Sequence, residues 1–261
     1  MVEFHPNLSE EEIRAIVSFL GYGRPSAPVW FIGLEEGLGH MDSDDAIRNL
    51  KARGKFGRVM DLYDAHLDLE EKGRPINIEN KPPSTQVWRW MAKIMLAVEG
   101  LDWRDRNLAK DYVRFRLGRA DGDTFMTELS PIPAGNAKDE VWRTLFKDLD
   151  PGLDSKINER RCELKKLLKE NAPPLVICYG RTRADAFAEL LDLYQWGHVS
   201  SGVSASPDLR CLLLPFFGLG QMSQLVIQVL LDKQLLSSRR ADLYQSGLSL
   251  SKSSLHHPSG V

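Results

Sequence analysis

The sequence predicts an α/β fold in three layers, with helices on both faces of a central four-stranded parallel sheet. Four short apolar segments, separated by segments with helical periodicity, lie at 29–32, 124–129, 174–179 and 212–214. Strands that alternate with helices favour a parallel sheet. The segment PLVICY at 174–179 is typical of a strand buried on both faces. With 261 residues and 43% hydrophobic content, the chain can bury one core, so we expect a single domain over residues 1–236.

Helix signals lie between the predicted strands. Ser9-Glu10-Glu11-Glu12 is a capping box before an apolar helical stripe, and we expect Gly21 to close this helix. Ser43 and Ser84 can each cap a further helix, and other helices are expected at 104–119, 156–170, after Gly180 and at 222–235. The segment 237–261 is rich in serine and has no periodicity, which predicts a disordered tail.

Composition excludes several classes of protein. The chain has no apolar run long enough to span a bilayer, and its first residues lack an apolar signal core, so we expect a cytoplasmic monomer with no membrane partner. The cysteines, Cys162, Cys178 and Cys211, are far apart and form no C-x-x-C, which argues against a disulfide framework, a zinc site or an iron–sulfur cluster. We therefore expect no metal and no cofactor. The net charge of −2 means that any DNA-binding face must be a local patch.

The segment PVWFIGLEEGLG at 28–39 is the first candidate site. The predicted strand ends at Gly33, and two adjacent carboxylates, Glu35 and Glu36, follow in a loop. Ligands of open parallel sheets bind beyond the carboxyl ends of the strands, which is where these side chains are expected. The glycine spacing matches neither a P-loop nor a dinucleotide fingerprint. The alternative is that both glutamates are ordinary solvated loop residues.

Loops after the other predicted strands also carry polar groups. The second strand runs into Ser130-Pro131-Ile132-Pro133-Ala134-Gly135-Asn136, and the fourth runs into Pro215–Gly220. After the third strand, Arg181 and Arg183 lie in the first turn of the expected helix, where free N–H groups favour a phosphate. Basic residues also cluster around Phe56, as either a solvated face or a phosphate-facing one.

The order of these four loops resembles the uracil-DNA glycosylase superfamily. Gly33-Leu34-Glu35-Glu36-Gly37 matches the position of the first motif of that family, and Thr127-Glu128-Leu129-Ser130-Pro131 is similar to its Thr-Asn-Leu-Val-Pro motif. Residues 176–181 with Ala184 are similar to the third motif. The final His-Pro-Ser is replaced by Pro215–Gly220, and the His257-Pro258-Ser259 of the tail, with no strand before it, is interpreted as chance.

The resemblance implies a flipped base held at the strand ends and DNA as the partner. Glu35 stands where the family positions its water, and Glu36 would be a second carboxylate or a loop cap. Leu219 or Met222 would fill the gap left in the duplex. Base contacts are expected from Gly33, Leu34, Phe56, Glu128, Phe216 and Phe217, and DNA contacts from Ser130, Asn136, Arg181, Arg183, Gly218, Leu219, Gln221 and Ser223.

Glu128 stands where the family has an asparagine, and this difference predicts the base. An ionised carboxylate only accepts hydrogen bonds, so it would repel O4 of uracil and match the N4 amino group of cytosine. We therefore expect a DNA glycosylase that excises a modified cytosine-type base, in repair or in defence against phage. A protonated Glu128 that donates to O4, or a Glu128 turned into a core salt bridge, would change this prediction. Other hypotheses are a non-catalytic nucleic-acid-binding module and a nucleotide hydrolase with Glu35 and Glu36 as metal ligands.

Overall fold

The computed structural model describes residues 8–37, 43–71, 74–78, 85–134 and 146–236, together with Gln245. Its helices are α1 (Glu10–Ser18), α2 (Ser43–Arg53), α3 (Leu62–Leu67), α4 (Gln86–Glu99), α5 (Arg106–Phe115), α7 (Leu153–Asn171), α8 (Ala184–Leu190) and α9 (Gln224–Asp232), with a 3₁₀ turn η1 (Arg181–Arg183) before α8. Its strands are β1 (Gly21–Gly23), β2 (Val29–Gly37), β3 (Val59–Met60), β4 (Glu70–Glu71), β5 (Arg74–Pro75), β6 (Thr124–Ala134), β7 (Leu175–Tyr179), β8 (Gly197–Ser200), β9 (Val203–Ala205) and β10 (Cys211–Leu214). The predicted tail 237–261 lies outside the described residues, apart from Gln245.

The predicted α/β class is confirmed, but the prediction of a four-stranded parallel sheet is wrong. The main sheet has eight strands in the order β3-β1-β6-β2-β7-β10-β9-β8. The four predicted strands, β2, β6, β7 and β10, are parallel and lie in its middle, whereas β1 pairs antiparallel with β6, and β9 pairs antiparallel with β10. The added strands are two to four residues long, and several contain glycine or serine, so they carry no apolar run that a sequence pattern could reveal.

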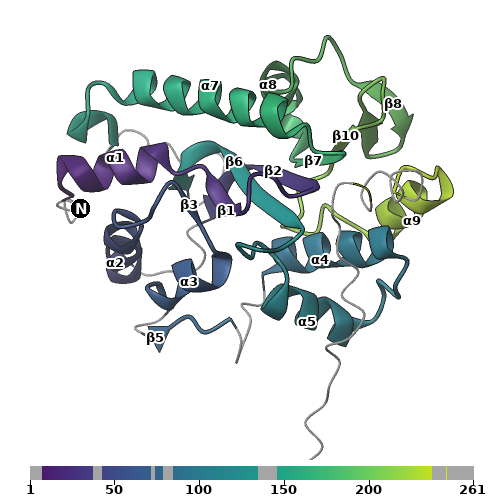
Figure 1. Cartoon of the computed structure of the whole chain (residues 1–261), viewed down its shortest axis with the longest axis horizontal. Helices are drawn as coiled ribbons and strands as arrows, with labels where there is room; N and C mark the ends of the chain where they lie inside the picture. Colours follow the sequence, from purple (N-terminus) through teal and green to yellow (C-terminus); the bar gives the residue numbers. More distant parts are fainter. Residues whose placement is uncertain are drawn as a thin grey trace, which may run out of the picture.

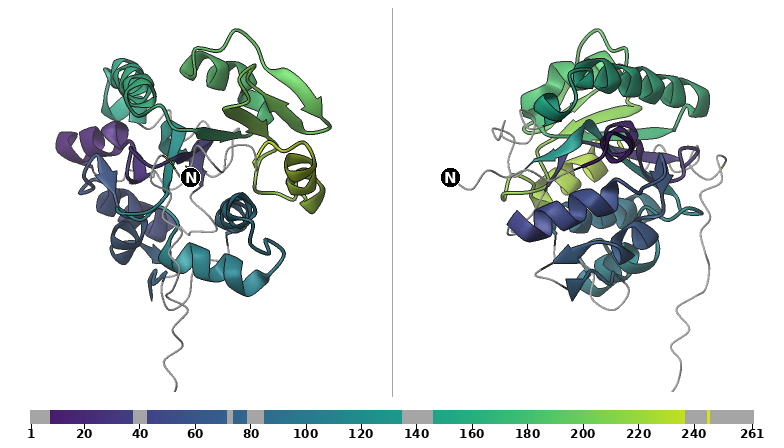
Figure 2. Two further views of the ribbon diagram at one scale, coloured as in Figure 1. Left: turned by 45° about the vertical axis from the view of Figure 1, so that its right-hand side comes forward. Right: turned by 90° about the vertical axis from the view of Figure 1, so that its left-hand side faces the viewer.

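Helices cover both faces of this sheet. In Figures 1 and 2, α7 lies along one face and α4 with α5 lies beyond the other. Alternating residues of β2 explain this arrangement, because successive side chains of a strand point to opposite faces. Trp30 and Ile32 pack with Leu164 of α7, and Phe31 packs in the cluster that contains Met91 of α4. Two buried cores on one sheet give a rigid platform for the loops at its edge.

Some helix boundaries differ from the predicted ones. The capping box of α1 is confirmed, because the Ser9 hydroxyl accepts from the Glu12 amide at 3.2 Å and the Ser9 amide donates to the Glu12 carboxylate at 2.7 Å. However, α1 ends at Ser18, and Gly21 is the first residue of β1 rather than the end of the helix. Thr85 caps α4 by accepting from the Trp88 amide at 3.2 Å, whereas Ser84 lies outside the described residues.

Strands β2 and β6 run further than predicted. Glu35 pairs with Ser130 and Gly37 pairs with Ala134, with an irregularity between them. Glu35, Glu36 and Ser130 were expected in loops but lie within strands, because the pairing of the two strands continues past the apolar segments. No helix in the described segments is long and apolar enough to cross a membrane.

Candidate active site at the carboxyl ends of the parallel strands

The ends of the four parallel strands lie at one edge of the sheet, as predicted. Their register pairs Gly33 with Glu128, Glu35 with Ser130, and Leu214 with Tyr179. Carboxyl and phenol groups from β2, β6 and β7 are therefore held by strand pairing, which is stiffer than a free loop. This edge is where open parallel sheets place their ligands.

Glu35 is half-buried, and this burial raises the pKa of its carboxyl group. The nearby positive charge of Arg183 opposes that rise. Arg183 belongs to η1, so a basic residue of the loop after β7 acts on a carboxylate of β2. A carboxylate in such a setting keeps some basicity, as a group that must take a proton from water requires.

The predicted phosphate site at the start of the helix after β7 lacks its expected geometry. The chain first forms the short turn η1, and α8 that follows has only seven residues. Arg181 and Arg183 are both exposed. Any phosphate there would be bound by the arginine side chains rather than by a helix N-terminus.

Glu36 is held in a different way from Glu35. Its carboxylate forms an ion pair with Arg53 of α2 and accepts a hydrogen bond from the Tyr22 hydroxyl at 3.0 Å. Burial alone would raise the pKa of Glu36, but Arg53 and the hydrogen bonds hold it below its usual value. This pairing engages Glu36 inside the fold. It favours a structural ion pair over both expected roles, a second catalytic carboxylate and a loop cap.

His66 completes this network, which sequence reasoning missed. Its Nδ1 lies 2.8 Å from the Leu62 carbonyl, and its ring packs on Tyr22 and Trp88 at centroid distances of 5.9 and 5.0 Å. Burial lowers the pKa of His66 to about 4, so the imidazole is neutral at neutral pH. The network ties α3 and α4 to the end of β2.

Glu128 and Tyr179 form a hydrogen-bonded pair at the centre of the edge. The Tyr179 hydroxyl donates to Oε1 of Glu128 at 2.9 Å, and the buried Oε2 has no hydrogen-bond partner in the part of the chain that the structure describes. Burial raises the pKa of Glu128 to about 8, helped by the negative charges of Glu36 and Glu35 and opposed by the Tyr179 hydrogen bond and by Arg160. This raised pKa favours a protonated Glu128 at pH 7 over the ionised form that the sequence suggests, because burial disfavours the charged form.

The alternative of a core salt bridge at Glu128 is not found among the described residues. Arg160 of α7 is the buried cation nearby, but its guanidinium donates to the carbonyls of Phe19 at 2.5 Å and Leu129 at 3.4 Å and to the Thr127 hydroxyl at 3.3 Å. It therefore contacts β6 on both sides of Glu128, at the Thr127 side chain and at the Leu129 backbone. No pattern in the sequence indicates this role, because Arg160 lies in a helix rich in charged residues.

Gly33 is required by the Glu128–Tyr179 pair. A Cβ atom at position 33 would lie 1.9 Å from Oε2 of Glu128 and 2.4 Å from the Tyr179 hydroxyl. Only a residue without a side chain leaves room for both groups. Leu34 instead points into the core, where it is 7% exposed and packs against Gly180. Its predicted contact with a base is therefore limited to its backbone.

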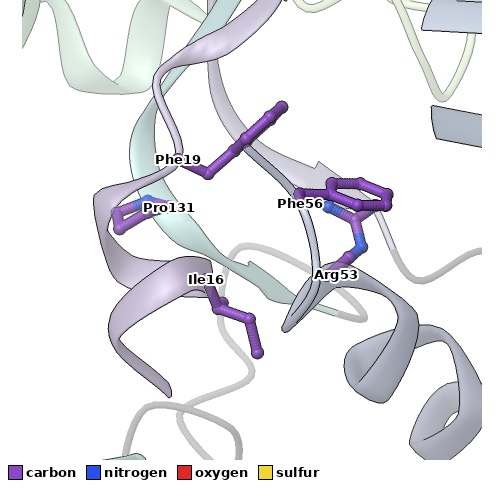
Figure 3. Close-up of a pocket in the computed structure, with 5 residues that line it drawn as sticks. All are labelled: Ile16, Phe19, Arg53, Phe56 and Pro131. Carbon is purple, nitrogen blue, oxygen red and sulfur yellow. The ribbon is translucent and has the colours of Figure 1, made fainter. Parts of the chain in front are cut away.

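The predicted aromatic residues fall into two groups. Phe217 stacks on Tyr179 with centroids 4.5 Å apart and planes at 10°, and Phe216 lies 6.2 Å from the same ring. Phe56 is elsewhere: it packs on Phe19 beside Arg53, in a crevice too narrow for a water molecule (Figure 3). Phe56 is thus a core residue rather than part of a base slot, because the turn after α2 directs it inward.

The loop after β10 exposes the residues that were predicted to meet DNA. Leu219 is 86% exposed and has a left-handed backbone with φ of 53°, and Gln221 and Ser223 are exposed as well. Met222 is 4% exposed, so Leu219 rather than Met222 is available as a wedge.

Other residues are also expected to contact DNA. The Ser130 hydroxyl accepts from the Ile132 amide at 3.2 Å, and Asn136 lies outside the described residues. Gly218, in the loop after β10, is partly buried.

Tyr179, like His66 and Arg160, is a residue of this region that sequence reasoning missed. It ends the apolar segment PLVICY and is 2% exposed, so it looks like an ordinary core residue. The available signal was its position, because it is the last residue of a parallel strand and points to the edge where ligands bind.

The chain was also compared with known proteins. No family model matches it, and no curated protein matches it. The described residues contain no group of three or more His, Cys, Asp or Glu side chains that could hold a metal ion.

Proposed function

We propose that the protein is a DNA glycosylase that hydrolyses the N-glycosidic bond of a flipped cytosine-type base and leaves an abasic site. The observation that carries this proposal is the pair Glu35 and Glu128. Both have a raised pKa, and they stand on the register-paired strands β2 and β6. Perturbed carboxyl groups that converge at the carboxyl edge of a parallel sheet are typical of catalytic sites.

Glu35 suits the hydrolytic step. Cleavage of an N-glycosidic bond develops positive charge on the sugar, and a nearby carboxylate both offsets this charge and orients the attacking water. Glu35 is partly open to solvent, whereas Glu36 is engaged by Arg53 and Tyr22. We therefore assign the role to Glu35 alone.

Glu128 suits the recognition of a cytosine-type base in either protonation state. A neutral carboxyl group can donate to N3 of cytosine and accept from its N4 amino group, and an ionised one still accepts from N4. Uracil also fits the neutral form, because its O4 can accept from the carboxyl group, so hydrogen bonding to a neutral Glu128 does not by itself select cytosine over uracil. We propose a modified cytosine as the substrate, since excision of ordinary cytosine would damage the genome of the cell. Repair and defence against phage with modified DNA are the matching roles.

The fold and the exposed loop agree with this proposal. The parallel strands in the order β6-β2-β7-β10 and the motifs at Gly33–Gly37 and Thr127–Pro131 support a divergent member of the uracil-DNA glycosylase superfamily. Leu219 is the residue available to enter the duplex, and Arg181 and Arg183 are available to phosphates. We propose that the protein acts as a cytoplasmic monomer.

The test is abasic-site formation on oligonucleotides that contain one cytosine, 5-methylcytosine, 5-hydroxymethylcytosine, glucosylated 5-hydroxymethylcytosine or uracil, as single strands and as duplexes. We expect excision of a modified cytosine well above cytosine and uracil. Glu35→Gln should keep DNA binding but lose roughly two or more orders of magnitude in excision. Glu189→Gln is the matched control, because Glu189 is a carboxylate of α8 whose partner Arg161 is 3.5 Å away.

Two results would contradict the proposal. Binding of these DNAs without abasic sites would indicate the non-catalytic nucleic-acid-binding module instead. Undiminished excision by Glu35→Gln would remove Glu35 from the mechanism.

A further inference from the structure

We propose that Glu128 is the acid that protonates the departing base, by transferring a proton from its Oε2 to N3 of a cytosine-type ring. This inference rests on the proposed function and adds a catalytic role to a residue that was expected only to read the base. It also defines the substrate class more narrowly, as a pyrimidine with an unprotonated ring nitrogen at position 3.

The geometry distinguishes the two oxygens of Glu128. Oε1 accepts a hydrogen bond from the Tyr179 hydroxyl at 2.9 Å, so it is the partnered oxygen of the two. Oε2 is buried against Gly33 and has no partner within the described residues. A buried polar atom without a partner costs about 1–3 kcal/mol, so such an atom needs an explanation. A ligand acceptor would satisfy Oε2, and because this atom has almost no exposed surface, a base reaches it only when the packing beside Gly33 opens.

The charges around Glu128 keep a proton available there. On β2, Glu35 and Glu36 favour the neutral form, and burial has the same effect. On β7 and α7, the Tyr179 hydrogen bond and the Arg160 charge favour the ionised form but do not prevail, so the pKa of Glu128 reaches about 8. Because Oε1 is the acceptor from Tyr179, the proton resides on Oε2. At pH 7 most molecules therefore carry an acid at this position.

The proposed step balances in protons and electrons. The Oε2–H bond of Glu128 breaks and an N3–H bond forms, which makes the attached base cationic. The C1′–N1 bond then breaks with its electron pair moving to the base, which leaves as a neutral tautomer rather than as an anion. Water forms a bond to C1′ and gives its proton to Glu35. Glu128 ends ionised and Glu35 ends protonated, and exchange with solvent restores both.

This step separates cytosine-type bases from uracil by chemistry. N3 of cytosine has a lone pair that can take the proton, whereas N3 of uracil already carries hydrogen. Uracil could at best receive a hydrogen bond at O4. General acid catalysis contributes typically 10²–10⁴-fold, so loss of the transfer is expected to dominate the discrimination.

The first test is the pH dependence of kcat/KM for the wild-type protein on the best modified-cytosine oligonucleotide. We expect an alkaline limb near the pKa of Glu128, about 8, with activity falling about tenfold per pH unit above it. Glu128→Gln keeps an acceptor for Tyr179 and resembles the neutral acid in shape. It should bind DNA like the wild type, lose roughly 100-fold or more in excision at pH 7, and lose this alkaline limb.

The second test changes the substrate and needs no variant. In the 3-deaza analogue of the best base, a C–H group replaces N3, so it cannot be protonated there. We expect wild-type protein to bind this DNA within a few-fold of the parent DNA and to excise the analogue at least 100-fold more slowly. Glu128→Gln should show no such difference between the two substrates.

The outcomes separate this inference from the function on which it rests. Excision by wild-type protein with an alkaline limb that persists in Glu128→Gln, or with equal rates on the base and its 3-deaza analogue, would overturn the inference alone. No excision of any base by wild-type protein would overturn the proposed function, and this inference with it.

Discussion

Glu36 of β2 and Glu128 of β6 are both partly buried but differ in charge. Glu36 pairs with Arg53 and has a pKa below its usual value, whereas Glu128 accepts a hydrogen bond from Tyr179 and has a pKa of about 8. Burial is the largest influence on both groups and acts in the same direction. The difference shows that a counter-ion, rather than depth in the fold, decides which carboxyl is ionised.

The two groups also differ in what they leave available. Arg53 and Tyr22 engage both oxygens of Glu36, so this carboxylate fixes the end of β2 against α2 and β1. Among the described residues, Oε2 of Glu128 has no hydrogen-bond partner, and it lies next to Gly33. A satisfied buried pair stabilises structure, and an unsatisfied buried acid is typical of a functional group.

The largest expected effect comes from removing the counter-ion of Glu36. Arg53→Met should destabilise the protein by about 3 kcal/mol or more, because it leaves a buried carboxylate unpaired. Thermal or urea unfolding measures this change. Arg48→Met is the matched control on α2, since the Arg48–Glu70 ion pair is far more exposed and should contribute about 1 kcal/mol or less. Equal effects of the two variants would contradict the structural role of the Glu36–Arg53 pair.

The second prediction concerns stability against pH, where the two carboxyl groups have opposite effects. The folded pKa of Glu128 is raised, so its contribution is complete below the unfolded pKa near 4.5 and is lost as pH rises towards 8. Between these values it lowers the free energy of unfolding by roughly 1.4 kcal/mol per pH unit. The lowered pKa of Glu36 acts conversely, since its contribution is lost as pH falls below its usual range.

Glu128→Gln isolates the first of these slopes. The stability of this variant relative to wild type should increase from pH 5 to pH 8, as measured by urea unfolding at each pH. A difference between the two proteins that stays constant with pH would show that Glu128 is ionised in the folded state.

The sequence predicted the scaffold of this site better than its electrostatics. The four parallel strands and the position of Glu35 follow from apolar runs that stop at polar residues, a local pattern that a single sequence displays. The short strands β1, β3, β8 and β9 have no such pattern, because pairing with neighbours rather than their own composition defines them.

The protonation of Glu128 and the pairing of Glu36 could not be predicted for a related reason. Both depend on partners distant in sequence: Tyr179 is 51 residues from Glu128, and Arg53 is 17 residues from Glu36. A pattern read along the chain treats Glu35 and Glu36 as equivalent neighbours. Only the folded structure shows that one of them is engaged by an arginine and the other is partly open to solvent.

A third prediction sharpens the role of the tyrosine beside Glu128. Its hydrogen bond lowers the pKa of Glu128, so Tyr179→Phe should raise that pKa further and move the alkaline limb of kcat/KM upward, by up to about one pH unit. Phe216→Leu is the control, because it perturbs the same aromatic cluster without touching the carboxyl. A limb that moves downward, or that moves equally in both variants, would contradict the assignment of the limb to Glu128.

The smallest expected effect concerns Glu35, the third carboxyl group of this edge, on which Arg183 acts through its charge. The charge of Arg183 lowers the pKa of Glu35, so Arg183→Gln should move the acid limb of kcat/KM upward, by a few tenths of a pH unit given the exposure of the arginine. Arg181→Gln, two residues away on the same turn η1, should leave this limb in place.

The same two variants test contact with DNA. If both arginines contact phosphates, each variant should also reduce the slope of log binding constant against log salt by about one, equally for all DNA sequences. The acid limb therefore tests the link between Arg183 and Glu35, and the salt slope tests the contact of both arginines with DNA. An acid limb that shifts in Arg181→Gln as much as in Arg183→Gln would show that the effect is a general loss of positive charge rather than a specific influence on Glu35.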